Sequence, residues 1–149
     1  MTDWLNFSAE QGLWGLFVAA FISATVLPGS SEIVLIAVLH QHPDQWWPAV
    51  LLATVGNTLG SMTSFLIGRL IPNKVQGRAI VRVHKYGYWV LLLAWVPLAG
   101  DALCVAAGWL RFSPWWSLLM IGIGKFARYL ILAGAWIWFA DAILPALAR

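Results

Sequence analysis

Four long apolar stretches follow one another along this chain, with short polar segments between them. They run from Gln11 to Leu39, from Gln45 to Gly68, from Tyr86 to Leu110 and from Phe112 to Ala140. A helix that crosses a membrane needs roughly 20 consecutive apolar residues. The second and fourth stretches meet this length without a break, so the pattern predicts two complete spanning helices.

The first and third stretches are interrupted by helix-breaking residues, Pro28 and Gly29 in one and Pro97 and Gly100 in the other. Proline removes a backbone donor, and the freed polar groups cannot face lipid. Each stretch is therefore either one kinked span or a re-entrant hairpin of two half-helices.

We favour the hairpins because the second arms, Ser31–Leu39 and Ala102–Leu110, are only about 9 residues or ~14 Å long. The first arms would be Gly12–Leu27 and Tyr86–Val96.

The two halves of the chain match in one constant register. Val26-Leu-Pro28-Gly-Ser-Ser-Glu32 aligns with Trp95-Val-Pro97-Leu-Ala-Gly-Asp101, and the same shift aligns the tryptophan pair at 46–47 with that at 115–116. Paired, interrupted apolar segments in the two halves of a membrane protein indicate a transporter-type inverted repeat. The predicted fold is therefore all-α and membrane-integral, with two re-entrant hairpins that are each followed by a transmembrane helix.

Composition supports a membrane protein and excludes several other classes. Hydrophobic residues make up 61% of the 149 residues and charged residues 10%, with a mean hydropathy of +0.79, whereas a soluble domain is about one quarter charged. The formal charge of +3 is too small to indicate nucleic-acid binding. The single cysteine, Cys104, allows no internal disulfide.

A basic segment divides the chain, which we interpret as one membrane domain over residues 1–149. Repeat 1 covers about 12–70, a linker 71–85 and repeat 2 about 86–141. From Arg69 to Lys85 there are five basic residues and no acid, so this segment is expected in the cytoplasm and both termini outside. It is either a short amphipathic helix on the membrane surface or a solvated loop.

Glu32 and Asp101 are the first candidate site residues, since an acid within an apolar segment is costly in lipid and usually functional. Each follows a helix break, so each could instead only stabilise a helix N-terminus. Lys125 and Arg128 are three residues apart on one helix face and need acidic partners. We therefore predict that the four charges meet in one polar cavity, with a purely structural ion network as the alternative.

Other polar residues carry weaker signals. Asn57 belongs to a polar stripe in the second span, within a small-residue pattern that is more typical of helix packing than of ligand contact. His40, His42 and Asp44 are too few to complete a metal site. No nucleophile motif is present, so the chain is not expected to be an enzyme and no cofactor or metal is expected.

Three segments together resemble the DedA family, also called the SNARE-associated or VTT-domain superfamily, and within it the short YqaA-type bacterial branch. They are Leu27-Pro-Gly-Ser-Ser-Glu32, Pro97-Leu-Ala-Gly-Asp101 with Ala106-Ala-Gly108, and Gly122-Ile-Gly-Lys125-Phe-Ala-Arg128-Tyr129. The resemblance implies a multi-pass protein of the bacterial inner membrane with opposed re-entrant hairpins, and lipid translocation. Larger members usually carry an arginine in the second re-entrant motif, and this chain has none there.

We therefore expect a flippase or scramblase that moves an anionic lipid or polyprenyl phosphate between leaflets. Lys125 and Arg128 would bind the headgroup, and Glu32 and Asp101 would balance them and allow coupling to protons. The alternatives are a proton-coupled small-ion exporter and a non-catalytic membrane factor that supports envelope homeostasis. Membrane lipids are the expected partners, nucleic acid is not, and a homo-oligomer remains open.

Overall fold

The fold is entirely helical over the part of the chain described by the computed structural model, which comprises residues 8–25, 29–72, 78–96 and 99–147. The α-helices are α1 (Ala9–Ser23), α2 (Ser30–Gln41), α3 (Trp46–Leu70), α4 (Arg78–Val90), α5 (Ala99–Trp109), α6 (Pro114–Ala142) and α7 (Leu144–Leu147). Two 3₁₀ segments, η2 (Pro43–Gln45) and η3 (Leu91–Trp95), join onto α3 and α4.

Two long helices form the axis of the molecule. The segments Pro43–Leu70 and Pro114–Ala142 are long and apolar enough to cross a membrane, with 28 and 29 residues and a mean hydropathy of 1.5 each. At 1.5 Å per residue both exceed the ~30 Å hydrocarbon layer of a bilayer. The two predicted spanning helices are therefore confirmed as candidate spans by length and composition.

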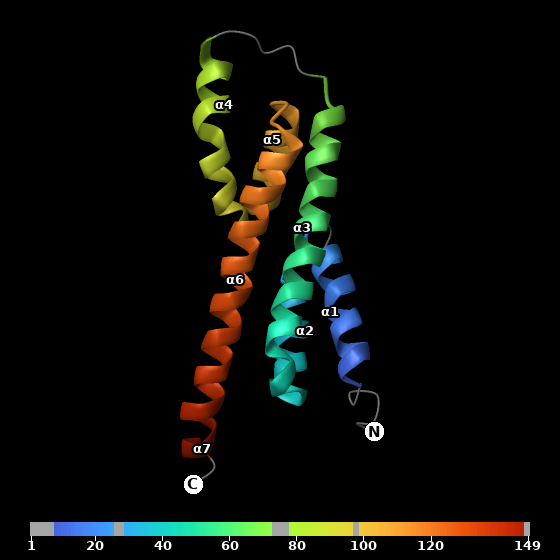
Figure 1. The fold of residues 1–149 in the computed structure, drawn as a ribbon, viewed down its shortest axis with the longest axis vertical. Coiled ribbons are helices and arrows are strands. Elements are labelled where there is room, and N and C mark those ends of the chain that lie inside the picture. The colour runs from blue at the N-terminus through green and yellow to red at the C-terminus, as the bar shows by residue number, and fades with distance from the viewer. Residues whose placement is uncertain (1–7, 26–28, 73–77, 97–98, 148–149) are drawn as a thin grey trace.

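The remaining helices form two pairs that approach from opposite ends of this axis (Figure 1). α1 rises from the end where α6 finishes, and α2 returns to that end, so α1 ends and α2 begins near mid-height. α4 descends from the other end and α5 returns. Neither interrupted stretch is one continuous helix, because each contains two helices that run in opposite directions.

The starts of the helices follow the sequence repeat closely. The shift that aligns the motifs carries the start of α1 onto that of α4, and the start of α2 onto that of α5. The same shift carries the start of α3 to the position just after the start of α6. The match predicted from a few motifs thus extends to the order and register of all the major helices.

Local sequence explains where the helices of the first pair begin. Ser8 and Gln11 form a capping box at the start of α1. Gly29 has a φ of 92° and precedes α2 directly, a backbone conformation that residues with a Cβ rarely adopt. α1 ends at Ser23 rather than at the predicted Leu27. Pro28 and Pro97, the predicted breaks, lie outside the described residues.

The second pair departs from two predictions. The basic segment is not a separate short helix, because its residues from Arg78 onward are the first turns of α4, which continues to Val90. The helix break precedes Gly100, which lies inside the first turn of α5. A Cβ at Gly100 would collide with the carbonyl oxygen of Ala94, so this glycine permits close packing rather than a bend.

Glycine contacts bring the helices close together. Gly56 and Gly60 of α3 face the backbone of α1 at Phe17 and Phe21. Gly68 of α3 and Gly108 of α5 face each other's backbones, so neither helix could carry a side chain there without moving. Small residues allow such close approach between helices in membranes, where packing replaces the hydrophobic effect as the driving force.

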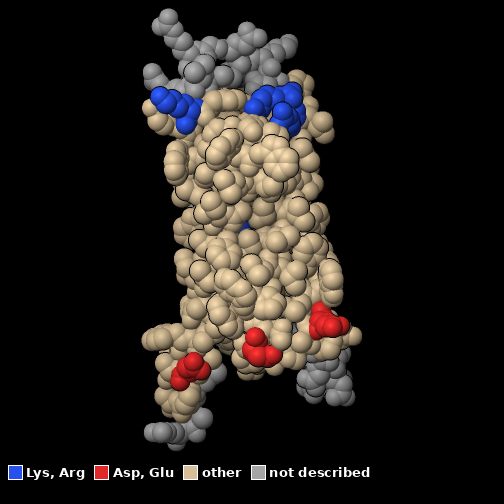
Figure 2. Space-filling view, viewed as in Figure 1, with Lys and Arg blue, Asp and Glu red and all other residues tan. Residues whose placement is uncertain are grey.

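The charges are sorted between the two ends of the molecule. In Figure 2, Lys and Arg gather at the end where α4 begins, and Asp and Glu at the end where α1 begins. By sequence position, the basic group includes Arg69, Lys85 and Arg111. The surface between these ends is almost free of charge in this view, as expected for a surface in contact with lipid.

Candidate functional site

Two cations lie at the middle of α6, where both helix pairs reach it. Lys125 and Arg128 are three residues apart, hence about 4.5 Å apart along the helix axis. Each pairs with an acid from a different helix pair: Lys125 with Asp101 of α5, and Arg128 with Glu32 of α2. The N-terminal ends of α2 and α5 therefore contact the same turn of α6, although the two helices belong to pairs from opposite ends of the molecule.

The Lys125 pair includes a contact from a third helix. Lys125 Nζ lies 3.8 Å from Asp101 Oδ1, and the side chains are 3% and 30% exposed respectively. The Ser61 hydroxyl of α3 donates a hydrogen bond of 3.3 Å to the same carboxylate oxygen. Asp101 thus joins three helices, and its cation is almost completely enclosed by protein.

The Arg128 pair has a second polar contact beside it. Arg128 Nη2 contacts Glu32 Oε1, with side-chain exposures of 11% and 31%. The Tyr129 hydroxyl donates a hydrogen bond of 2.9 Å to Ser31 Oγ, which in turn donates to Ser23 Oγ at 3.3 Å. The start of α2 is therefore tied to α6 by an ion pair and by a buried chain of hydroxyl groups.

Both acids occupy the first turn of a helix, Glu32 in α2 and Asp101 in α5. A negative charge there interacts favourably with the helix dipole. The carboxylates are thus stabilised from two sides, by the helix behind them and by the cation of α6. The exposed part of each pair is its acid.

The structure brings the four predicted charges together at the middle of α6 as two ion pairs. A groove lies between α3 and α6, and none of the four charged side chains lines it.

Asn57 has a packing role here. Its side-chain nitrogen donates a hydrogen bond of 3.0 Å to the carbonyl oxygen of Ala20, near the end of α1. The side chain is buried, with 3% of the residue exposed. It therefore fastens α1 to α3, in keeping with the interpretation of its small-residue pattern.

Sequence reasoning missed the residues that complete the two pairs, namely Ser61, Ser31, Ser23 and Tyr129. Ser31 and Tyr129 each stand next to a predicted charge in sequence, which is a usable signal. The only sequence signal for Ser61 is that it belongs to the polar stripe of the second span. Within the described residues no group of three or more His, Cys, Asp or Glu side chains could hold a metal ion.

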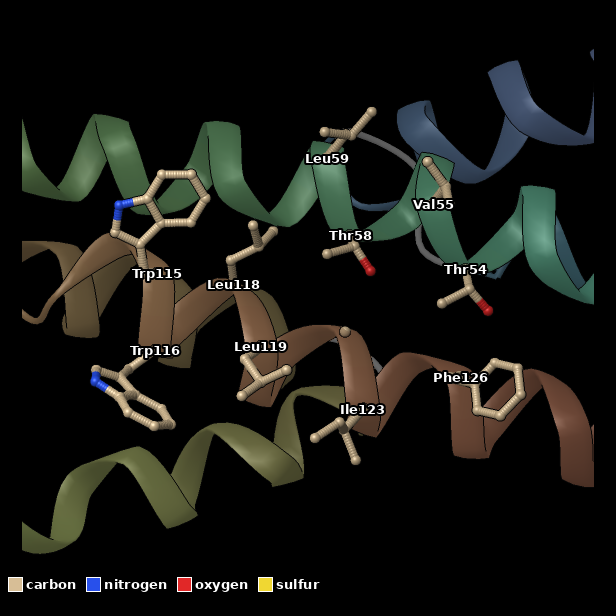
Figure 3. A pocket seen from close by; sticks show the side chains of 11 residues that line it. Thr54, Val55, Thr58, Leu59, Trp115, Trp116, Leu118, Leu119, Ile123 and Phe126 are labelled. Atoms are coloured by element: carbon tan, nitrogen blue, oxygen red, sulfur yellow. The ribbon is translucent and has the colours of Figure 1, made fainter.

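A groove lies beside the paired charges, between α3 and α6, with a volume of about 760 Å³. Figure 3 shows Thr54 and Thr58 projecting from α3 towards α6. Its lining is mainly apolar and aromatic: Thr54, Val55, Thr58, Leu59, Trp115, Trp116, Leu118, Leu119, Gly122, Ile123 and Phe126.

Long apolar helices, a nearly uncharged belt and buried ion pairs define a helical membrane protein. The sequence profile of the VTT domain matches residues 27–137. The chain is 41% identical over 132 residues to "Inner membrane protein YqaA" of Escherichia coli (strain K12), covering 86% of this chain and 93% of that protein. An uncharacterized protein of Haemophilus influenzae is 39% identical over 139 residues, covering 85% and 88% respectively. No solved structure matches.

The chain therefore belongs to the VTT-domain, or DedA, family and is a bacterial inner-membrane protein. This confirms the family resemblance and the inner-membrane location predicted from the sequence.

Proposed function

We propose that this protein moves an anionic lipid, or a lipid-linked phosphate, between the leaflets of the inner membrane. The observation that carries the proposal is the meeting of two helix pairs, from opposite ends, at two cations in the middle of α6. A charge at the centre of a bilayer is costly and usually marks a transport pathway. Arg can bind a phosphate through two parallel hydrogen bonds, and Lys binds it as a point charge.

In this proposal the two helix pairs are re-entrant hairpins of an inverted repeat. α1 with α2 enters from one side of the membrane, and α4 with α5 from the other. The end with Arg69, Lys85 and Arg111 is the cytoplasmic one, by the positive-inside rule. Access to the centre of α6 would alternate as one hairpin or the other moves away.

The acids control access to the cations. Glu32 and Asp101 are about 30% exposed, whereas Lys125 is 3% exposed, so an approaching phosphate would meet a carboxylate first. A proton on the carboxylate removes both its repulsion of the phosphate and its hold on the cation. Lipid movement would therefore be faster when the acids are protonated, so its rate would depend on pH.

The test is a leaflet-specific lipid assay with purified protein in liposomes. Labelled phosphatidylglycerol should leave one leaflet faster than labelled phosphatidylcholine, and faster at lower pH. Lys125→Ala or Arg128→Ala should abolish the movement while Lys85→Ala, which removes an exposed lysine, should not. Glu32→Gln and Asp101→Asn should weaken the dependence on pH, because the amides cannot titrate.

Three results would contradict the proposal. Equal rates for both lipids would indicate nonspecific scrambling. Proton or ion flux without lipid movement would indicate a small-ion exporter. Unchanged activity of all four charge variants in folded protein would show that the charges are structural only.

A further inference from the structure

The groove between α3 and α6 has the length of one membrane leaflet. On α6 its lining runs from Trp115 to Phe126, a distance of about 16 Å at 1.5 Å per residue. This is roughly half of the ~30 Å hydrocarbon layer. The groove begins at the basic end of the molecule and ends beside Lys125, at the level of the ion pairs.

The lining suits a hydrocarbon chain. Apart from the indole groups of Trp115 and Trp116, only Thr54 and Thr58 contribute polar side-chain atoms. Gly122 leaves room on the α6 side, since a Cβ there would meet nothing closer than Thr58 Cγ2 at 3.9 Å. An acyl chain would therefore lie against apolar side-chain atoms along most of its length.

The mouth of the groove suits a phosphate. Arg69 lies about three helical turns beyond Thr58 and so projects from the same side of α3. Its Nη1 donates a hydrogen bond of 3.2 Å to the carbonyl oxygen of Phe112, just before the start of α6. A guanidinium has five N–H donors, so this contact positions Arg69 and leaves others for an anion. Trp115 is 79% exposed, as is typical of an aromatic side chain at the headgroup level.

The equivalent aromatic pair of the first repeat contacts the other end of the groove. Trp46 and Trp47 are the repeat equivalents of Trp115 and Trp116. Trp47 packs against Phe126 with ring centroids 6.1 Å apart, where the groove ends. Trp46 is 38% exposed whereas its repeat equivalent Trp115 is 79% exposed, so the two halves of the repeat differ on this face.

We propose that this groove is the loading site for an anionic glycerophospholipid from the leaflet at the basic end. One acyl chain lies along α6 from Trp115 to Phe126, and the phosphate lies at Arg69. The inference rests on the proposed function and names the leaflet, the entry route and a specificity-determining residue for it. The bound chain would end next to the ion pairs, so the lipid is held where a moving hairpin could receive it.

Photocrosslinking tests the groove directly. Purified protein in lipid nanodiscs is given phosphatidylglycerol with a diazirine in one acyl chain, or phosphatidylcholine with the same chain. Crosslinks should concentrate at 54–59 and 115–126. Gly122→Leu should remove most of them by filling the groove. Gly134→Leu, the same change in the same helix where a Cβ meets nothing within 4 Å, should not.

Arg69 is tested by headgroup preference. Arg69→Gln should reduce crosslinking of phosphatidylglycerol to the level of phosphatidylcholine, a change of about tenfold if one charge-assisted contact is lost. Arg69→Lys should restore most of the preference. Normal circular dichroism and gel filtration of each variant would show that the fold is intact.

Two crosslinking results would overturn the inference. Labels spread evenly over all lipid-facing helices, or unaffected by Gly122→Leu, would show ordinary boundary lipid. Protein–protein crosslinks at 115–126 that rise with protein density would show that a second copy occupies the groove. If Gly122→Leu still moves lipid at the normal rate while Arg128→Ala does not, the groove assignment fails and the proposed function stands.

Discussion

At the scale of the residue, the central feature is that each buried cation has its own acid. Removing one member of a buried ion pair leaves an uncompensated charge, which usually costs more than the pair itself contributes. The partial exposure of the acids reduces this cost, because water or headgroups can reach the carboxylates. In each pair, loss of the acid and loss of the cation should therefore change the free energy of unfolding by different amounts.

The first prediction concerns the Glu32–Arg128 pair. Glu32→Ala should lower the free energy of unfolding by about 2 kcal/mol, because Arg128 is then left without its acid at 11% exposure. Glu32→Ala combined with Arg128→Met should cost less than the sum of the two single changes. Thermal unfolding in detergent micelles would measure this. Strict additivity would show that the two side chains do not interact.

The second prediction concerns the buried hydroxyl chain. Tyr129→Phe should destabilise the protein by about 1 kcal/mol, because Ser31 loses the hydrogen bond that links α2 to α6. Tyr86→Phe is the matched control, since Tyr86 is 57% exposed. The same unfolding measurement applies. Equal effects at both positions would argue against a role for this contact.

At the scale of the element, glycine decides how the helices approach one another. The close faces of α3 and α5 are Gly68 and Gly108, each against the other helix's backbone. Backbone cannot yield as a flexible side chain can, so an added methyl group must push the helices apart. That displacement would also shift Asp101 at the start of α5 relative to Lys125.

The third prediction follows from this contact. Gly68→Ala or Gly108→Ala should destabilise the protein by roughly 1–3 kcal/mol through overpacking. Gly134→Ala should be neutral or slightly stabilising, because alanine is the better helix former and the site is open. Thermal unfolding of the three variants side by side would test this. A loss at Gly134 as large as at Gly108 would refute the packing explanation.

At the scale of the whole molecule, the separated charges and the two opposed helix pairs define an orientation. The described acids outside the centre are Glu10, Asp44 and Asp141, at the end where α1 begins and α6 finishes. Positive charge is retained on the cytoplasmic side of membrane proteins. The acidic end should therefore face the periplasm.

The fourth prediction tests this orientation. In a Cys104→Ala background, single cysteines at Asp44 and Asp141 should react with a membrane-impermeant thiol reagent added to spheroplasts. Single cysteines at Lys85 and Arg111 should react only after permeabilisation. Labelling of Asp44→Cys and Asp141→Cys from opposite sides would be incompatible with two opposed hairpins.

The sequence by itself determined the class, the family and the repeat. Hydrophobic length, helix-breaking residues and a constant shift between matching motifs are local or linear properties, and they predict elements because backbone and lipid constrain them strongly. It also singled out Glu32, Asp101, Lys125 and Arg128, since charges in apolar segments are rare. The helix ends were predicted less accurately: α1 ends at Ser23 rather than Leu27, and α4 begins at Arg78 rather than Tyr86. Tertiary contacts extend or shorten helices beyond their local signals.

Only the tertiary structure decided which charges pair and where space remains. Two acids and two cations allow more than one pairing, and the choice depends on where the starts of α2 and α5 meet α6. The groove between α3 and α6 likewise depends on which residues face one another across two helices that are distant in sequence. Trp47 contacts Phe126 at the end of this groove, whereas its repeat equivalent Trp116 lines the groove itself. The two similar repeats thus differ because the neighbours of equivalent residues differ in space.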